Sequence, residues 1–293
     1  MIVSASRRTD IPCWYAEWFM NRVAAGYAMT RNPMNSRQIR RVSLLPGDAD
    51  CFVFWTKDPG RAKAGGQSFL DTLPVLDESG YIYYFQFTLT PYGPEIERGQ
   101  RGKADIARDF ARLSGHIGKE RVIWRYDPII LNADYGLTSG WHAAAFAGMC
   151  EKLRRYTEAV VISFADVYAK LRTDLVRETP PEEMMDLAAR MGEIARKYGL
   201  RVRACCERTD FSVVGIEKAA CVDRELVEKI AGRPLELKPD RNQRQSCGCA
   251  ESVDIGAYNT CPGGCVYCYA NHSPASIAKN IARYRAEGEF LLG

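Results

Sequence analysis

The sequence predicts an α/β protein, built as a partial or complete parallel (β/α) barrel of the TIM type with a cysteine-rich cap near its C-terminal end. Short apolar runs rich in β-branched and aromatic residues alternate with longer stretches of helical period, as in parallel sheets whose strands are joined by helices. The length of 293 residues also suits one such barrel. After about Cys205 the alternation fades and cysteines become dense, which indicates the cap. A doubly wound open sheet is the alternative architecture.

The expected elements follow from this pattern. Strands are predicted at residues 2–6, 51–56, 82–89, 122–126, 160–164 and 202–206. Helices are predicted at residues 14–25, 67–76, 103–117, 139–156 and 181–198. Residues 26–46 do not fit the repeat and are expected to form a small hairpin or lid, with "TRNPMN" as its turn. We therefore expect a barrel domain over residues 1–232 and a cysteine-rich segment over residues 233–293 that packs on the barrel mouth.

Composition excludes several classes of protein. Hydrophobic residues make up 46% and charged residues 26%, which are ordinary values for a globular protein and argue against disorder. Lys and Arg exceed Asp and Glu by only 40 to 36, so charge alone makes nucleic acid an unlikely partner. The sequence has no signal-peptide-like start and no apolar run of membrane-spanning length, and we expect a cytoplasmic protein without a membrane partner. Three histidines are too few for a His-rich zinc hydrolase or a two-metal nuclease.

Charged side chains recur where the predicted strands end. In parallel α/β folds the site lies beyond the carboxyl ends of the strands. Pairing of basic and acidic residues there predicts a pocket for a small charged substrate, although each pair alone could equally be a solvated ion pair. The candidate catalytic residues are Arg7, Arg8, Asp10, Lys57, Arg125, Asp127 and Glu207.

A compact cysteine motif, "CPGGCVYC", places Cys261, Cys265 and Cys268 on a glycine-rich loop. Glycine lets the backbone fold tightly around a single centre. Zinc sites usually present cysteines as two separated pairs, whereas here three ligands come together and a fourth is missing. Three thiolates would leave one iron of a [4Fe–4S] cluster without a protein ligand, so that a small molecule could bind it.

A second group of cysteines could form another centre. Cys221, Cys247 and Cys249, together with Cys205 or Cys206, could supply four thiolates to an auxiliary iron–sulfur cluster or to zinc. Cys205 and Cys206 could instead be apolar residues of a strand core. The other three cysteines, Cys13, Cys51 and Cys150, lie in apolar or helical settings and are expected in the core.

The motif Cys261-x3-Cys265-x-Tyr267-Cys268 resembles the cluster motif of the radical S-adenosylmethionine (SAM) superfamily. The resemblance implies a full or partial (β/α) barrel in which the open iron chelates SAM and a reduced cluster cleaves it to a 5′-deoxyadenosyl radical. It also implies an electron donor such as flavodoxin or ferredoxin. In that superfamily the motif follows the first strand, and a Gly-Gly-Glu sequence after the second holds the SAM amino group. Here the motif lies about 25 residues from the C-terminus. Either the arrangement is permuted, with Arg7, Arg125 or Glu207 holding SAM, or the cluster serves another purpose.

The whole chain also resembles a family known as domain of unknown function 1848. The resemblance rests on "SASRRTDIP", "FWTKDP", "RYDPI" and "DIGAYNTCPGGCVYCYAN", which span nearly the full length. It implies that the barrel and the cysteine-rich segment function as one unit.

Two further hypotheses compete with a radical SAM-like enzyme. In the first, zinc or a fully ligated cluster only pins the C-terminal segment to a non-catalytic barrel. In the second, the barrel processes phosphate compounds or nucleic acid with Arg7, Arg8 and Lys57, and it would bind nucleic acid in a salt-sensitive manner. The near-neutral net charge places this hypothesis last.

Overall fold

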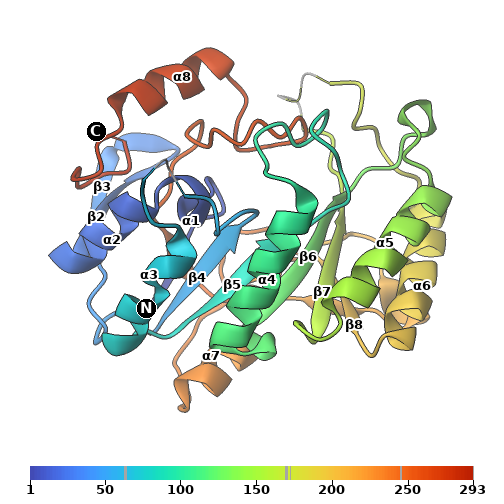
Figure 1. Cartoon of the computed structure of the whole chain (residues 1–293), viewed down its shortest axis with the longest axis horizontal. Coiled ribbons are helices and arrows are strands. Elements are labelled where there is room, and N and C mark those ends of the chain that lie inside the picture. The colour runs from blue at the N-terminus through green and yellow to red at the C-terminus, as the bar shows by residue number, and fades with distance from the viewer. Residues whose placement is uncertain (63–64, 169–170, 172, 245, 293) are drawn as a thin grey trace.

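The protein is built around one parallel sheet with eight strands, seen in a computed structural model that describes residues 1–62, 65–168, 171, 173–244 and 246–292 (Figure 1). The strands, in spatial order, are β10 (Ser252–Asp254), β1 (Ile2–Ala5), β4 (Cys51–Thr56), β5 (Tyr83–Thr88), β6 (Val122–Ile129), β7 (Ala159–Phe164), β8 (Arg201–Cys205) and β9 (Glu217–Ala219). From β1 to β9 each new strand is added on the same side. Every neighbouring pair in this sheet is parallel.

The parallel α/β architecture predicted from the sequence is confirmed at this level. All six predicted strands are present, with bounds that differ by three residues at most. The two edge strands, β9 and β10, were not predicted because each has only three residues and neither forms an apolar run. Within the described ranges no ladder joins β9 to β10, so the sheet is not closed by strand pairing.

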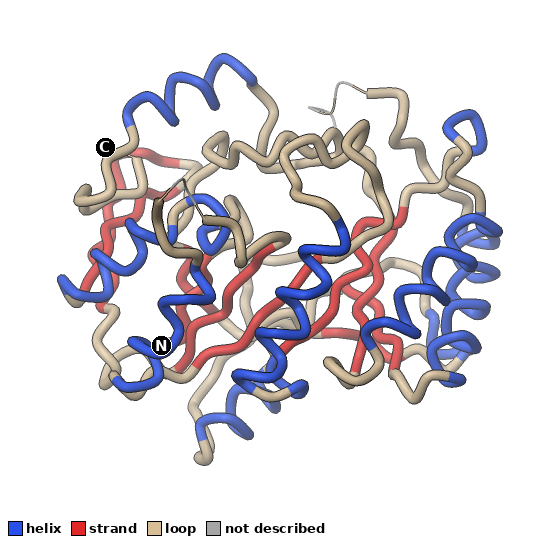
Figure 2. Tube along the Cα trace, in the orientation of Figure 1, coloured by secondary structure: helices blue, strands red, loops and turns tan. Residues whose placement is uncertain are grey.

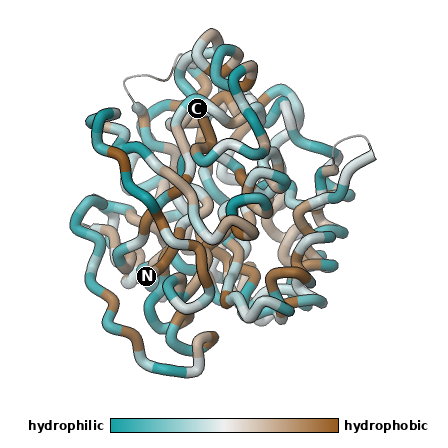
Figure 3. The backbone as a smooth tube through the Cα atoms, turned by 90° about the vertical axis from the view of Figure 1, so that its left-hand side faces the viewer, coloured by the Kyte–Doolittle hydropathy of each residue, from teal (hydrophilic) through white to brown (hydrophobic). Residues whose placement is uncertain are grey.

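Helices cover one face of the sheet and form the larger core with it. They are α1 (Ile11–Trp14), α2 (Ala16–Ala25), α3 (Phe69–Glu78), α4 (Lys103–Ile117), α5 (Ser139–Leu153) and α6 (Pro181–Lys197). Because side chains alternate along a strand, Phe52 and Phe54 of β4 point to this face and pack with Phe19 of α2. The helix-strand arrangement is drawn in Figure 2, and Figure 3 shows hydrophobic stretches mainly within the body of the protein.

The opposite face of the same strands carries a second, smaller core. Val53 and Tyr84 pack there with Val227 of α7 (Arg224–Ala231) and with Leu235. In Figure 1, α7 lies near the amino ends of the strands, while the cysteine-rich C-terminal segment crosses the opposite end. Apolar residues on both faces explain why β4 and β5 read as continuous hydrophobic runs.

A two-stranded antiparallel sheet stands apart from the main one, as predicted for a hairpin at residues 26–46. It consists of β2 (Tyr27–Asn32) and β3 (Asn35–Ser43), and it packs beside the C-terminal residues through a Met29–Phe290 bridge. The last helix, α8 (Pro274–Arg283), has no buried residue. Three short 3-10 helices, Lys119–Arg121, Ala133–Tyr135 and Phe211–Val214, complete the regular elements. None of the described helices combines the length and apolar character needed to cross a membrane.

His142, in α5, is a buried polar residue of the larger core. Its side chain is fully buried, with Nδ1 accepting from the Tyr126 hydroxyl at 2.9 Å and Nε2 facing the Ile130 carbonyl at 2.9 Å. Burial lowers the pKa of His142 to about 4, because the charged imidazolium would lose its hydration.

This buried imidazole predicts acid sensitivity of the fold. Between about pH 6.5 and pH 4 the unfolded chain binds a proton at this position that the folded protein does not, so the free energy of unfolding falls as the pH falls, by about 3 kcal/mol in total. Urea unfolding at about pH 7 and pH 4.5, compared with H142Q, measures the difference. An equal pH dependence in H142Q would assign the acid sensitivity to other groups.

Candidate functional site

A cavity of about 1140 Å³ opens at the carboxyl ends of the strands. Eight of the eleven cysteines line it, and they are Cys205, Cys206, Cys221, Cys247, Cys249, Cys261, Cys265 and Cys268. The remaining three, Cys13, Cys51 and Cys150, are buried, as predicted for core residues. The two cysteine groups therefore border the same cavity, although they are separated in the sequence.

The cysteine loop, residues 255–273, follows β10 directly and is fixed to the start of the chain. Asp254 ends β10 and accepts hydrogen bonds from Ser4 Oγ at 2.9 Å, Ser6 Oγ at 2.6 Å and the Arg7 N–H at 2.8 Å. Tyr269 donates from its hydroxyl to the Arg7 carbonyl at 2.7 Å. Because β10 is parallel to β1, the loop leaves the sheet at the same edge as the residues that follow β1.

A second loop, residues 89–102 after β5, holds the cysteine loop from the other side. The Gly99 N–H donates to the Gly263 carbonyl at 2.9 Å, and the Val266 N–H donates to the Ile96 carbonyl at 3.0 Å. Glycine is required at position 99, since a Cβ there would lie 2.7 Å from the Gly263 carbonyl oxygen. Gly264 adopts a φ of +62°, a conformation that glycine adopts most readily.

Glu97 is the polar centre of this junction. One carboxylate oxygen accepts from Lys57 Nζ at 2.8 Å, from Thr90 Oγ1 at 2.9 Å and from the Tyr267 hydroxyl, and the other pairs with Lys103. Its side chain is 1% exposed. Burial alone would raise the pKa of Glu97, but the two ammonium groups outweigh this effect and lower it to about 2. A buried carboxylate thus ties the cysteine loop to β4 and to the loop after β5.

The three cysteines of the loop are held as thiols by their surroundings. Burial raises the pKa of Cys261 and of Cys265 to about 12, and it also raises the pKa of Cys268. Only thiolates bind metals, so a bound cation would have to offset this preference. Within the described part of the chain, no three His, Cys, Asp or Glu side chains are arranged, as they stand, to hold a single metal ion.

Unpartnered polar atoms lie beside Cys261. A Cβ placed on Gly263 would lie 3.3 Å from Cys261 Sγ, 3.7 Å from Gln100 Nε2 and 3.8 Å from Trp14 Nε1. Trp14 Nε1 and Gln100 Oε1 are both buried and have no hydrogen-bond partner among the described residues. Buried donors and acceptors normally find partners, so this space suits a group that can accept a hydrogen bond.

In the second cysteine group, Cys205 ends β8, Cys221 follows β9, and Cys247 and Cys249 precede β10. Cys205 Sγ and Cys221 Sγ are 3.0 Å apart, and Cys249 Sγ accepts from the backbone N–H of Cys221 at 3.3 Å and of Val222 at 3.4 Å. Arg125 donates from Nη1 to Cys221 Sγ at 2.9 Å. The pKa of Cys205 is lowered to about 7, mainly by its contact with Cys221 and to a smaller extent by the positive charge of Arg125. Contacts with Cys221 and Cys247 also lower the pKa of Cys249, whereas contact with Cys205 raises the pKa of Cys221 and contact with Cys249 raises that of Cys247, so the group favours a mixture of thiolates and thiols.

Six of the seven predicted catalytic residues line the large cavity, namely Arg7, Arg8, Asp10, Lys57, Arg125 and Asp127. Among them, Asp10, Lys57, Arg125 and Asp127 have structural partners. Asp10 accepts from the Lys57 N–H at 2.7 Å and the Cys13 N–H at 3.0 Å, and burial raises its pKa to about 6. Lys57 pairs with Glu97, and Arg125 pairs with Asp127. The guanidinium carbons of Arg7 and Arg125 lie 5.2 Å and 5.6 Å from the Trp55 ring centroid.

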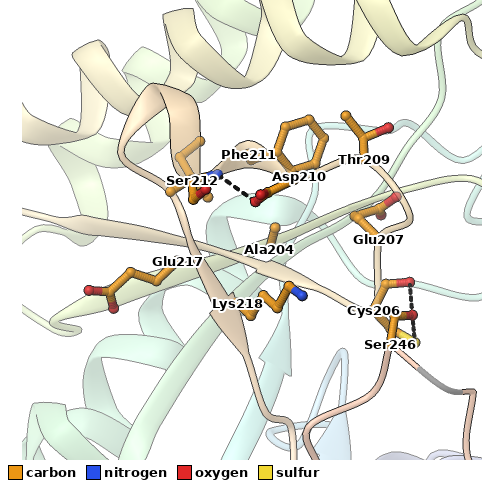
Figure 4. Close-up of a pocket in the computed structure, with 11 residues that line it drawn as sticks. Ala204, Cys206, Glu207, Thr209, Asp210, Phe211, Ser212, Glu217, Lys218 and Ser246 are labelled. Atoms are coloured by element: carbon orange, nitrogen blue, oxygen red, sulfur yellow. Dashed lines mark hydrogen bonds between the residues drawn. The ribbon is translucent and has the colours of Figure 1, made fainter.

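Glu207, the seventh candidate, lines a smaller neighbouring hollow of about 360 Å³ that Figure 4 draws. Its carboxylate accepts from the Phe164 N–H at 2.8 Å, and burial raises its pKa to about 7. Cys206 borders both hollows, has a φ of +57°, and lies 3.5 Å from Ser246 Oγ. The structure thus places Glu207 next to the cavity rather than in its lining.

Glu97 and Asp254 organise the site, and neither was a candidate from the sequence. Asp254 lies in the quoted segment "DIGAYNTCPGGCVYCYAN", which offered a weak signal. Glu97 lies with Glu95 in the Pro- and Gly-rich stretch "PYGPEIERGQRG", where acidic residues resemble any solvated loop charges. Its partner Tyr267 is 170 residues away, so no local pattern could reveal the contact.

Replacing Glu97 should loosen the cysteine loop. In E97Q the ammonium groups of Lys57 and Lys103 lose their carboxylate, and we expect the free energy of unfolding to fall by about 3–5 kcal/mol, as for other broken buried pairs. The matched control is E95Q, since Glu95 is exposed in the same loop and should change stability by at most about 0.5 kcal/mol. Urea unfolding and limited proteolysis of residues 255–273 would detect the difference, and equal results for both variants would contradict this role of Glu97.

Comparison with known proteins gives one match. A family model described as "Domain of unknown function (DUF1848)" matches residues 2–270, a range that includes both cysteine groups and the ends of the strands that border the cavity. None of the curated proteins matches the chain. Because the family model covers most of the sequence, the chain belongs to the DUF1848 family.

Proposed function

We propose that the protein is an iron–sulfur enzyme of the radical SAM type, in which Cys261, Cys265 and Cys268 bind a [4Fe–4S] cluster with one open iron. The observation that carries the proposal is the position of the cysteine loop. The loop follows β10, and β10 occupies the edge of the sheet next to β1. Counted across the sheet, the motif therefore follows the first strand, as in the superfamily that it resembles. The strand order corresponds to a circular permutation of that arrangement.

A permuted barrel agrees with contacts at the seam between β9 and β10. Val222, just after β9, accepts a hydrogen bond from the Ala250 N–H, just before β10, at 2.9 Å. Across the interior, Tyr84 Oη and Gln86 Nε2 donate to the Cys221 carbonyl at 2.6 Å and 2.9 Å. These contacts support a partial barrel completed by irregular chain, with residues 255–273 acting as the cap at its mouth.

The three cysteines of the loop suit a cluster, because each of them can bind a different iron. The cysteines that hold a cluster bind different irons, so their sulfur atoms lie farther apart than the ligands of one zinc ion. The unpartnered Trp14 Nε1 is placed to donate a hydrogen bond to a sulfur near Cys261. When bound, the cluster would supply the electron that cleaves SAM, with flavodoxin or ferredoxin as the reductant.

The chain's own residues would position SAM and exclude water. No Gly-Gly-Glu follows β1, the second strand across the sheet, and "SRRTD" stands there instead. Arg7 is suited to bind the SAM carboxylate, because its Nη2 atom is buried without a partner among the described residues. Asp10 is occupied by backbone N–H groups and orients the turn after β1. Arg7 and Arg125 both lie over the Trp55 ring and would line the same part of the pocket, and Glu207 remains a candidate for proton transfer.

We further propose that Cys205, Cys221, Cys247 and Cys249 bind a second metal centre, either zinc or an auxiliary cluster. The donor set of four cysteines suits both. At 3.0 Å, Cys205 Sγ and Cys221 Sγ are closer than two ligands of a tetrahedral zinc, which lie about 3.8 Å apart for a Zn–S bond of about 2.3 Å. The thiols would therefore separate slightly on binding.

Metal analysis of anaerobically purified protein tests both centres. We expect about four irons and four sulfides per chain for one cluster, with either zinc or further iron at the second site. C265A should lose the first centre and all reductive conversion of SAM to 5′-deoxyadenosine. C221A should lose only the second metal. The matched control is C150A, since Cys150 is buried far from either group in sequence and should keep both metals.

Zinc alone in a colourless anaerobic preparation would overturn the enzyme proposal and favour the structural metal hypothesis. Unchanged SAM cleavage in C265A would also contradict it, because a cluster that has lost one of its three cysteine ligands should not remain bound.

A further inference from the structure

The antiparallel pair β2–β3, here called the ribbon, is an exposed arm beside the cavity. The first seven residues of β3 are exposed, and the ribbon stands outside the main sheet (Figures 1 and 2). Part of its length nevertheless lines the cavity, including Thr30, Gln38 and Arg40. An exposed arm that borders a cavity can bind a large ligand and guide part of it inside.

The ribbon carries concentrated positive charge. Arg31, Arg37, Arg40 and Arg41 lie on it, and no Asp or Glu occurs between residues 18 and 47. None of the four has a carboxylate partner within the residues described, whereas arginines elsewhere, such as Arg101, form ion pairs. Unpaired guanidinium groups at this density favour an extended anion.

Aromatic rings hold two of these arginines in place. The guanidinium carbon of Arg31 lies 4.2 Å from the Phe290 ring centroid, and that of Arg41 lies 4.0 Å from the Tyr27 ring centroid. Stacking of this kind orients the guanidinium plane and does not use its N–H groups. The charges are therefore preorganised for ligand phosphates.

Apolar and aromatic side chains complete the surface. Met34, at the turn of the ribbon, is 92% exposed, and Ile39 is 50% exposed. The residues Tyr258 and Tyr269, which also line the cavity, are 38% and 45% exposed. All four line the same cavity. An apolar tip can wedge between stacked bases, and exposed tyrosine rings can stack on an unstacked base.

We propose that the ribbon binds the phosphodiester backbone of a nucleic acid and delivers one nucleotide to the cavity. A two-stranded ribbon has the right width for the major groove, and enzymes that act on bases take them out of the stack into a pocket. An acidic protein would match the arginines, but it would not explain why the exposed Met34 and two exposed tyrosines line the same cavity. The inference stands whether or not the cysteines hold a cluster, because it rests on the ribbon and the cavity rim.

The test is binding of fluorescently labelled oligonucleotides to the full chain, with single-stranded DNA, duplex DNA and RNA as separate arms. The ribbon variant is R31Q/R37Q/R40Q/R41Q. The matched control removes the same charge from exposed positions of α5, α6 and the residues next to them, as R154Q/R155Q/R190Q/K197Q. We expect wild-type affinity to fall about 100-fold between about 50 and 200 mM salt, for about four phosphate contacts. The ribbon variant should bind at least about tenfold more weakly than wild type. The slope of log affinity against log salt concentration should become smaller by about four, while the control stays close to wild type.

A second variant, M34S, tests delivery of the nucleotide. An oligonucleotide that carries 2-aminopurine should fluoresce more strongly when wild-type protein unstacks it, and M34S should remove this increase while keeping the salt slope. The arm that binds identifies DNA or RNA as the source of the phosphodiester.

Three results would overturn the proposal. The first is no binding in any arm. The second is equal loss in the ribbon and control variants. The third is displacement of the oligonucleotide by polyglutamate at equal charge concentration, which would indicate an acidic protein partner. An M34S response equal to that of wild type would reject delivery of the nucleotide.

Discussion

The parallel pairing of β10 with β1 is the constraint on which the site depends. β10 has three residues and could not stand alone as a strand, so the side chain of Asp254 supplies much of what holds it. That carboxylate accepts from Ser4, Ser6 and the backbone of Arg7, and from the Gly256 N–H at 2.9 Å. Because these donors come from both ends of the chain, one half-buried acceptor sets the direction in which the cysteine loop leaves the sheet. Its thiols consequently face the cavity instead of solvent.

The inner face of the sheet changes character along its strands, and this change creates the cavity. Near the amino ends, Ile2, Val53 and Tyr84 pack with α7 as an apolar layer. Two residues further along β4, Trp55 donates to Ser4 Oγ at 3.1 Å. Side chains of one face recur every two residues. The change from an apolar residue such as Ile2 to a polar one such as Ser4 therefore marks where the core ends and the site begins. The packed apolar layer lies directly below the polar residues of the site and supports them.

The sequence allowed the prediction of elements whose signal is local. β4 and β5 are long apolar runs, and the glycine-rich cysteine loop has close spacing, so each could be recognised without a partner. β9 and β10 could not, because their strand character depends on neighbours that are remote in the sequence. The same reason hid Glu97, whose partners Lys57 and Tyr267 belong to separate segments. The predicted grouping of Cys205 with Cys221 involves residues that do meet, whereas the domain boundary at residue 232 stays a prediction.

The charge on one part of the surface can differ strongly from the overall charge balance of the sequence. The near balance of 40 basic and 36 acidic residues argued against nucleic acid, and that argument assumes that both signs are evenly mixed. In the folded chain many carboxylates are used internally, as Glu97 and Asp58 are, and they neutralise nearby cations. Among the residues that the structure describes, the ribbon arginines have no such partner, because residues 27–43 contain no acid and the strands project from the main sheet. Screening by salt limits the distance over which each charge acts to about 8–10 Å. A protein that is almost neutral overall can therefore still present a local field strong enough to attract a phosphate backbone.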